Sequence, residues 1–159
     1  MIKNPTFSAA LLALSALVLP MPGAVALAHP ASQERQEKAN IATVTAFYNA
    51  ALNEKDAEKA KTYLGPRYIQ HNPAAKDGAE GMAAFVGFLK AQFPQNRSEI
   101  KRSFASGDHV ILHVHNKRTP DSRGNAIMEI FRLEKGKIVE HWDVIQEIPE
   151  KPANTNGMF

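Results

Sequence analysis

The sequence contains no cysteine among its 159 residues. This absence excludes disulfide bonds, a thiol nucleophile, a thiolate metal site and a lipid-modified N-terminal cysteine. Disulfide bonds stabilise many small exported domains, so a chain without them obtains its stability from packing alone. We therefore expect a domain built around a sizeable apolar core.

The sequence also lacks a strong excess of one charge, because 19 Lys and Arg side chains stand against 16 Asp and Glu side chains. The basic residues are scattered and do not form a stripe with aromatic residues between them. Surfaces that bind nucleic acid usually carry such a stripe. We therefore expect no nucleic-acid partner.

Long apolar runs are scarce, and the most prominent one extends from Ala9 to Leu19. It follows Lys3 and precedes Ala26-Leu27-Ala28, which is typical of a signal-peptide cleavage site. The run is shorter than the roughly 20 apolar residues that cross a bilayer. We predict that residues 1–28 form a secretory signal peptide. The mature chain, from His29, would then be periplasmic or secreted, with no membrane attachment after cleavage.

Helices are expected early in the mature chain. Apolar residues recur at helical spacing from Glu37 to Leu52 and from Ala79 to Phe93. Asp56 is a capping candidate for a short helix between them that stops at Gly65-Pro66. A short strand is expected at residues 67–71, and the polar residues before Glu37 are expected to be a frayed lead-in.

Four strands joined by short turns are expected after the third helix. They cover residues 97–105, 109–117, 125–133 and 137–148. The turn-like connections between them favour an antiparallel meander. Helices followed by strands indicate an α+β domain over residues 29–148, with the helices against one face of a curved antiparallel sheet. Residues 149–159 are expected to form an extended C-terminal tail.

Several ionisable side chains can be assigned to strand faces, because successive side chains on a strand point in opposite directions. Glu129 shares its face with large apolar residues, a costly position for an acid that is neither paired nor neutral. If neighbouring strands present their polar sets to one concavity, five side chains converge there: His113, His115, Glu129, His141 and Asp143. Alternatively, these side chains lie on a solvated face while the aliphatic set faces the helices.

The order and the amino-acid sequences of several segments resemble those of SnoaL-like polyketide cyclases, a branch of the nuclear transport factor 2-like superfamily. The segments are the run from Phe47 to Asp56, Tyr68-Ile-Gln-His-Asn-Pro73, Asp77-Gly78 and the run from Glu129 to Gln146. The resemblance covers nearly the whole mature chain and is more specific for the superfamily than for one reaction. It implies a cone in which three helices wrap a strongly bent antiparallel sheet around a pocket.

The resemblance also implies chemistry. Cyclases of this family use a pocket acid and histidines to move protons during an intramolecular aldol closure, with no metal or organic cofactor. It places the catalytic groups at Glu129, His113 and His71, with Glu129 replacing the commoner aspartate and reaching one methylene further. Together with the strand faces, it gives these further pocket candidates: Tyr48, His115, Phe131, His141 and Asp143. For Tyr48, simple core packing is the alternative.

Other functions stay open. Ketosteroid isomerases share the fold and a helical tyrosine comparable to Tyr48, but they need an aspartate where this chain has Asn72. A divalent metal held by His113, His115 and either His141 or Glu129 is chemically reasonable. The spacing of His113 and His115 matches the two histidine ligands of the cupin metal motif. The glutamate of that motif is missing, however, since Thr119 and Pro120 stand in its place. A non-catalytic pocket or association module is a third class.

The favoured interpretation is an exported protein with a small-molecule pocket. It would act without a cofactor as an aldol-type cyclase, isomerase or lyase on an apolar oxygenated substrate. The resemblance implies a homodimer, and the apolar content of both strand faces predicts that it forms through the outer face of the sheet.

Overall fold

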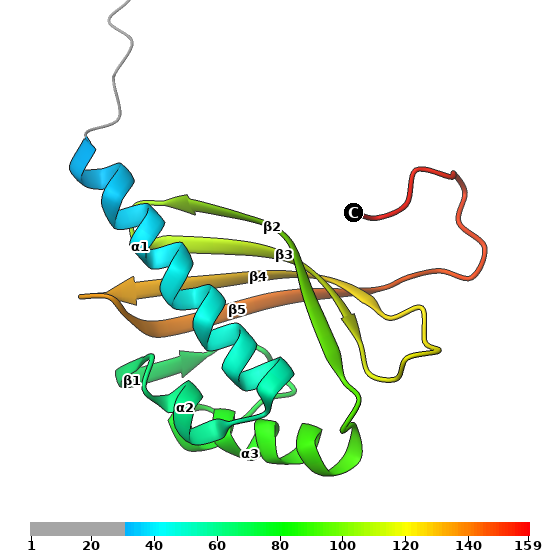
Figure 1. The fold of residues 1–159 in the computed structure, drawn as a ribbon, viewed down its shortest axis with the longest axis horizontal. Coiled ribbons are helices and arrows are strands. Elements are labelled where there is room, and N and C mark those ends of the chain that lie inside the picture. Colours follow the sequence, from blue (N-terminus) through cyan, green and yellow to red (C-terminus); the bar gives the residue numbers. More distant parts are fainter. Residues whose placement is uncertain (1–30) are drawn as a thin grey trace, which may run out of the picture.

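The computed structural model describes residues 31–159, so the predicted signal peptide lies outside the described part. The first elements are α1 (Ala31–Tyr48), the π-helical turn η1 (Asn49–Glu54), α2 (Ala57–Lys61), β1 (Leu64–Gln70) and α3 (Gly78–Gln92). Four strands follow: β2 (Arg97–Ser106), β3 (His109–Lys117), β4 (Asn125–Glu134) and β5 (Lys137–Glu147). This order confirms the α+β prediction (Figure 1). None of the helices in residues 31–159 is both long and apolar enough to cross a membrane.

The five strands form one sheet in the order β1-β5-β4-β3-β2. β2 to β5 pair antiparallel and confirm the predicted meander. β1 pairs with β5 in parallel, so the sheet is mixed and the expectation of an antiparallel sheet is wrong for this strand. No hairpin turn joins β1 to β5, because α3 and three strands intervene, and turn chemistry therefore does not impose an antiparallel pairing.

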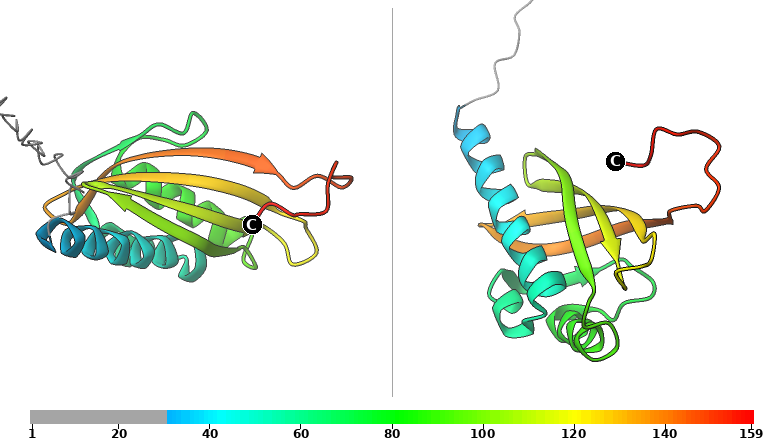
Figure 2. Two further views of the ribbon diagram at one scale, coloured as in Figure 1. Left: turned by 90° about the horizontal axis from the view of Figure 1, so that it is seen from above. Right: turned by 45° about the vertical axis from the view of Figure 1, so that its right-hand side comes forward.

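The helices pack on one face of the curved sheet (Figures 1 and 2). α1 lies against β2 and β3, while α3 contacts α2 and β1. The inward side chains of β3, Val110, Leu112 and Val114, are fully buried and pack in one core with Val44 and Phe47 of α1. A register shift between Ile100 and Arg102 interrupts the β2–β3 ladder, and such irregularities increase strand bending.

The helix α1 begins earlier than the sequence pattern predicts. Residues from Ala31 are helical, although no apolar periodicity precedes Glu37. Glu37 and Asn40, just inside the predicted range, anchor this end of the helix to the β2–β3 turn: Glu37 accepts from the backbone N–H of Gly107, and the buried amide of Asn40 donates to the Gly107 carbonyl. These contacts are tertiary, so apolar spacing along the helix does not reveal them.

The strand β1 also differs from its predicted limits, since it starts at Leu64 and includes Pro66. Proline lacks the backbone donor that a central strand needs, but an edge strand tolerates it. β1 is an edge strand, and its register with β5 shifts between Leu64 and Ile69, on either side of this proline. The proline therefore ends no element here.

Candidate active site

A pocket of about 200 Å³ lies between the helices and the inner face of the sheet. Sites for drug-sized ligands usually measure about 300 to 1,000 Å³, so this pocket suits a smaller molecule. Most of its wall is apolar. The apolar lining includes Phe47, Leu52, Met82, Val86, Leu89 and Ile127.

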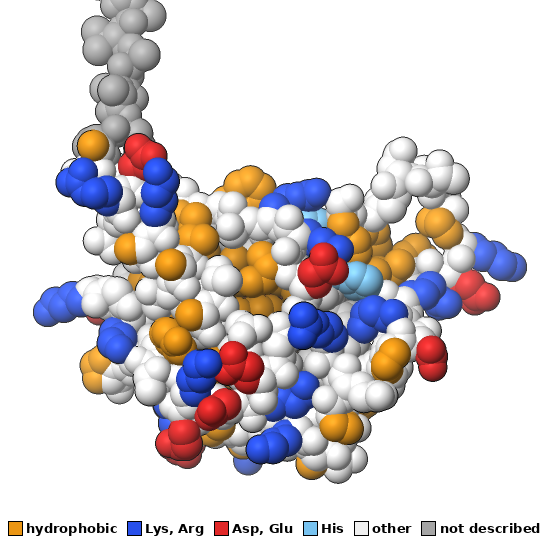
Figure 3. Space-filling view, viewed as in Figure 1, with side chains coloured by type: hydrophobic (Ala, Val, Ile, Leu, Met, Phe, Trp, Pro, Cys, Tyr) orange, Lys and Arg blue, Asp and Glu red, His pale blue; other side chains and the backbone are white. Residues whose placement is uncertain are grey.

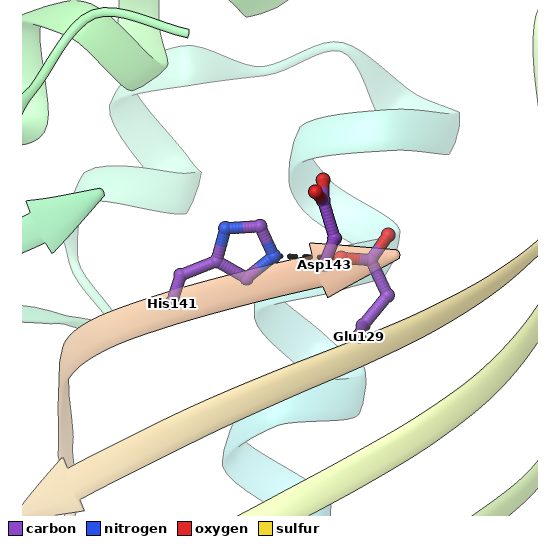
Figure 4. Close-up of side chains that lie close together, drawn as sticks. All are labelled: Glu129, His141 and Asp143. Atoms are coloured by element: carbon purple, nitrogen blue, oxygen red, sulfur yellow. Dashed lines mark hydrogen bonds and ion pairs between the residues drawn. The ribbon is translucent and has the colours of Figure 1, made fainter. Parts of the chain in front are cut away.

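Three ionisable side chains meet at one end of this pocket (Figure 4). Glu129 of β4 stands opposite Asp143 of β5, and His141 lies on the same face of β5 as Asp143. One possible ligand atom from each of the three lies within 4.8 Å of the others. The structure therefore brings these three of the five predicted side chains together.

Glu129 is only 5% exposed, and both of its carboxylate oxygens have partners. The Tyr48 hydroxyl donates to Oε1 over 2.7 Å, and His141 Nε2 lies 2.6 Å from Oε2. A buried carboxylate is tolerated when it is paired and hydrogen-bonded. The expectation that this acid needs a partner is therefore confirmed.

The hydrogen bonds around His141 fix how its ring is protonated. His141 Nδ1 lies 2.9 Å from Oε1 of Gln70, and the same oxygen accepts from the backbone N–H of Asn72 over 2.8 Å. That second bond sets the orientation of the Gln70 amide, so His141 Nδ1 carries a hydrogen and donates. At Nε2 the ring then faces Glu129 with one proton between the two groups. Glu129 Oε2 and His141 Nε2 therefore share one proton across a short hydrogen bond.

Tyr48 remains a hydroxyl donor in this environment. Burial raises the pKa of Tyr48 well above its usual value, and the neighbouring charge of Glu129 raises it further. Core packing, the alternative predicted for Tyr48, accounts only for its ring, because the hydroxyl donates a hydrogen bond to Glu129.

Asp143 is the second carboxylate of the site and is half-buried. Its two oxygens accept from Asn72 Nδ2, over 2.9 and 2.7 Å. Burial raises the pKa of Asp143, the Asn72 hydrogen bonds lower it, and the charge of Glu129 raises it again, with a net upward shift. A carboxylate with a raised pKa is a stronger base than an ordinary aspartate.

Phe131 holds the imidazole from the side. Its ring lies 4.7 Å from the His141 ring, centroid to centroid, and makes edge contacts with Phe47 and Tyr48 at 5.8 and 6.4 Å. Phe131 is 1% exposed. Phe131 lines the pocket and packs against two of the hydrogen-bonded side chains.

His113 and His115 do not join this cluster. Leu112 stands opposite Glu129 on β4, whereas His113 stands opposite Met128, so the two histidines project from the other face of the sheet. There their rings contact the terminal Phe159, at centroid distances of 5.2 and 4.7 Å. Their expected convergence with Glu129 is wrong, because Glu129 belongs to the opposite alternation set. A metal site that combines them with Glu129 or His141 is wrong for the same reason.

His71 also lies outside the pocket. Its Nε2 lies 2.8 Å from the Glu140 carboxylate, and its ring stacks on Trp142 at 4.7 Å. Glu140 and Trp142 alternate with His141 and Asp143 along β5 and therefore face the other way. His71, which the resemblance places among the catalytic groups, therefore does not contact the cluster of Glu129, His141 and Asp143.

Two residues of the site were not among the predicted site residues, although Asn72 was noted where isomerases have an aspartate. Gln70 orients His141, and Asn72 orients Asp143. Alternation along β1 places Tyr68, Gln70 and Asn72 on one face. That pattern, together with the pocket position of Tyr68, is the signal that could have found them.

The three ionisable groups also form a possible donor set for a divalent metal. One imidazole and two carboxylates suit first-row metals. In this arrangement, however, Glu129 and His141 are bonded to each other, and Asp143 is bonded to Asn72. Metal binding would require at least the short Glu129–His141 bond to open, so the geometry fits proton transfer better than metal ligation.

Helices packed on one face of a bent mixed sheet, with a pocket between them, match the nuclear transport factor 2-like fold. Within that class, the family profile of the SnoaL-like domain matches residues 44–141, more than half of the chain. The chain therefore belongs to the SnoaL-like domain family. No curated protein sequence matches it.

Solved structures support the same fold. A Bacillus cereus protein named as a candidate polyketide cyclase is 18% identical, with a TM-score of 0.62 over 70% of this chain and 77% of that chain. TsrD from Streptomyces laurentii is 24% identical, with a TM-score of 0.58 over 68% of this chain and 89% of that one. An epoxide hydrolase of Mycobacterium tuberculosis is 19% identical, with a TM-score of 0.56 and coverages of 70% and 85%. These similarities establish the fold, and the differing names of these proteins fix no single reaction.

Proposed function

We propose that this protein is a cofactor-independent acid/base enzyme that acts on a small, apolar, oxygenated molecule. The observation that carries the proposal is the short Glu129–His141 hydrogen bond beside a separate carboxylate, Asp143, at the polar end of an apolar pocket. Export of the mature chain is part of the proposal and rests on the N-terminal sequence pattern.

The two carboxylates suit different roles. Asp143 is the base, because its raised pKa favours proton uptake and its Asn72 partner fixes its direction. The Glu129–His141 pair is the acid, because it holds a proton between two basic atoms at 2.6 Å. Two titratable groups held in different environments are the usual arrangement for paired acid and base catalysis.

The proposed reaction is an aldol-type closure. Asp143 removes a proton from the carbon next to a carbonyl group, and that carbon attacks a second carbonyl in the same molecule. The new alkoxide oxygen takes the proton held by Glu129 and His141. Asp143 then returns its proton to the pair, so no proton is gained or lost. An isomerisation uses the same first step and returns the proton to another carbon.

The first step can be tested without knowing the natural substrate. A methyl alkyl ketone incubated with residues 29–159 in heavy water should incorporate deuterium next to its carbonyl faster than in buffer, as measured by mass spectrometry. Asp143→Asn should remove the acceleration. Asp121→Asn is the matched control, because Asp121 is an exposed acid outside the acid cluster.

The outcomes separate enzyme from binding module. Exchange that is enhanced in the control and lost in Asp143→Asn supports the enzyme. A protein that binds the ketone but exchanges no faster than buffer would be a non-catalytic ligand-binding module, and the proposal would be abandoned.

A further inference from the structure

The pocket has a second polar end with different chemistry. Arg118, Asn116 and Asn125 line it together with Asn96. Asn116 of β3 stands opposite Asn125 of β4, whereas Leu112 stands opposite Glu129. Asn125 and Glu129 are therefore four positions apart on β4, a distance of about 13 Å along a strand. The apolar lining lies between these two ends.

Arg118 supplies a positive charge at this end. Its guanidinium lies over the Phe93 ring, 4.9 Å from the ring centroid, and an aromatic face of this kind orients a planar guanidinium. Within residues 31–159, Arg118 has no carboxylate at ion-pair distance, whereas Arg132 pairs with both Glu134 and Glu140. Asp121 and Glu147 line the neighbouring surface depression with Arg118 and Arg123 but form no ion pair with Arg118.

Asn125 adds an amide donor beside this charge. In the described part of the chain its side chain has no hydrogen-bond partner. Asn116 is already engaged, because its Nδ2 donates to Asn96 Oδ1 and Ser98 Oγ over 3.0 and 2.9 Å. A ligand therefore meets two available donors here, the Arg118 guanidinium and the Asn125 amide.

The two ends carry opposite charge, and this fixes how a charged ligand lies. An anionic group is repelled by the Asp143 carboxylate at one end and attracted by Arg118 at the other. A carboxylate has two oxygens that can accept parallel hydrogen bonds from the planar donor fork of arginine, whereas an anion with one acceptor atom can accept only one.

We infer that the ligand is an amphiphilic monocarboxylate, bound with its carboxylate at Arg118 and Asn125 and its oxygenated carbon at Asp143. This inference rests on the proposed function only for the reacting end. The carboxylate end concerns binding and is tested separately.

Calorimetry on residues 29–159 with decanoate and with decanol tests the inference. The two probes share a chain and differ in head-group charge, so decanoate should bind more tightly, and its affinity should fall as salt is added. Arg118→Gln should weaken decanoate binding at least about tenfold, the usual size of a lost charge-assisted bond. Decanol binding should be unchanged. Arg67→Gln is the control, since Arg67 is exposed on β1 and does not line the pocket.

A second measurement locates the carboxylate. Decanoate should shift the side-chain amide NMR signals of Asn125 in the wild-type protein and leave them unshifted in Arg118→Gln. Equal affinity for the two probes, absence of decanoate binding, or an affinity unchanged by Arg118→Gln overturns the inference. Failure of the deuterium exchange with decanoate binding intact would instead remove the proposed reaction and leave this binding site standing.

Discussion

The Glu129 carboxylate and the His141 imidazole lie 2.6 Å apart on adjacent antiparallel strands, and both are less than a tenth exposed. Because His141 donates its other nitrogen's hydrogen to Gln70, one proton lies between the two groups. The pair is neutral overall wherever that proton resides, which lowers the cost of burying it. This arrangement explains how an acid can stand among the large apolar residues of β4.

Replacing Glu129 with glutamine should preserve the fold and stop the chemistry. The oxygen of the introduced amide can still accept from Tyr48, and its nitrogen can donate to His141 Nε2. We expect turnover to fall by about a hundredfold or more, the usual worth of a positioned acid or base. Turnover, melting temperature and metal content should be measured on the same variant. Glu99→Gln, on an exposed acid of β2, is the control.

Three outcomes distinguish the roles of Glu129. Loss of turnover alone identifies an acid/base group. A large drop in melting temperature with turnover retained identifies a structural ion pair. Loss of bound metal identifies a metal ligand, and unchanged turnover in a folded variant removes Glu129 from the mechanism.

Removal of the Tyr48 hydroxyl should cost stability. Tyr48→Phe keeps the ring contacts with Phe131 but leaves one oxygen of a buried carboxylate without its donor. Such a loss costs about 1 to 3 kcal/mol. Urea unfolding of wild type and variant measures this difference. Tyr63→Phe is the control, because no side-chain hydrogen bond involves the Tyr63 hydroxyl in the described residues. Equal stability of Tyr48→Phe and wild type would contradict the assigned bond.

Asp143 should make stability depend on pH. Because its pKa is raised in the folded state, that state binds the proton more tightly than the unfolded chain does. This contribution is fully present below the unfolded pKa and is lost as pH rises through the folded pKa. Asp143→Asn removes this dependence. The melting temperature of the variant relative to wild type should therefore increase as pH rises from below the ordinary aspartate pKa of about 3.9 through the raised pKa of Asp143.

Activity should respond to the same group in the opposite direction. A base must be ionised, so the rate of deuterium exchange should rise with pH through the raised pKa of Asp143. A difference in melting temperature that is constant with pH, or an exchange rate that falls over this range, would contradict the role of Asp143.

The fold was largely predictable from the sequence, because its elements depend on local signals. Apolar spacing marks α3, and the Gly107 turn marks the β2–β3 connection. The parallel pairing of β1 was not predictable in this way, since Leu64 meets Ile138 across most of the domain. Local alternation contains no information about such a partner.

The site was only partly predictable. Alternation correctly grouped Glu129 with Phe131, and His141 with Asp143. It could not determine which alternation set of β3 shares their face, because that depends on the β3–β4 register, in which Leu112 and not His113 meets Glu129. The histidines on the other face are numerous in the sequence but contact the tail and Trp142.

The outer face of the sheet should mediate dimerisation. Val144 is 70% exposed and stands opposite Met128, which is 39% exposed, and Phe104 of β2 is 53% exposed. Figure 3 shows the side of the molecule on which α1 crosses the strands, where apolar side chains are exposed among Lys and Arg side chains. Exposed apolar patches usually mark interaction surfaces. Light scattering at micromolar concentration should give a dimer mass for wild type and a monomer mass for Val144→Lys.

The control for this experiment is Glu134→Lys, which introduces the same charge at the exposed end of β4. It should stay dimeric. A wild-type monomer at micromolar concentration would remove the dimer prediction.

The mature chain should begin at His29, after the Ala26-Leu27-Ala28 pattern. Intact-mass measurement of protein recovered from an expressing cell should show the loss of residues 1–28. Full-length protein in the membrane fraction would contradict export. Ala28→Gln should impair cleavage, because the cleavage site requires small residues.

The position of β5 between β1 and β4 has a consequence for folding kinetics. β1 can find its partner only when the final strand arrives, and such distant pairings form slowly. That same strand brings in His141 and Asp143. Closure of the sheet and assembly of the proposed acid/base site are therefore one event, and a nascent or truncated chain that ends before Lys137 lacks both the closed pocket and that site.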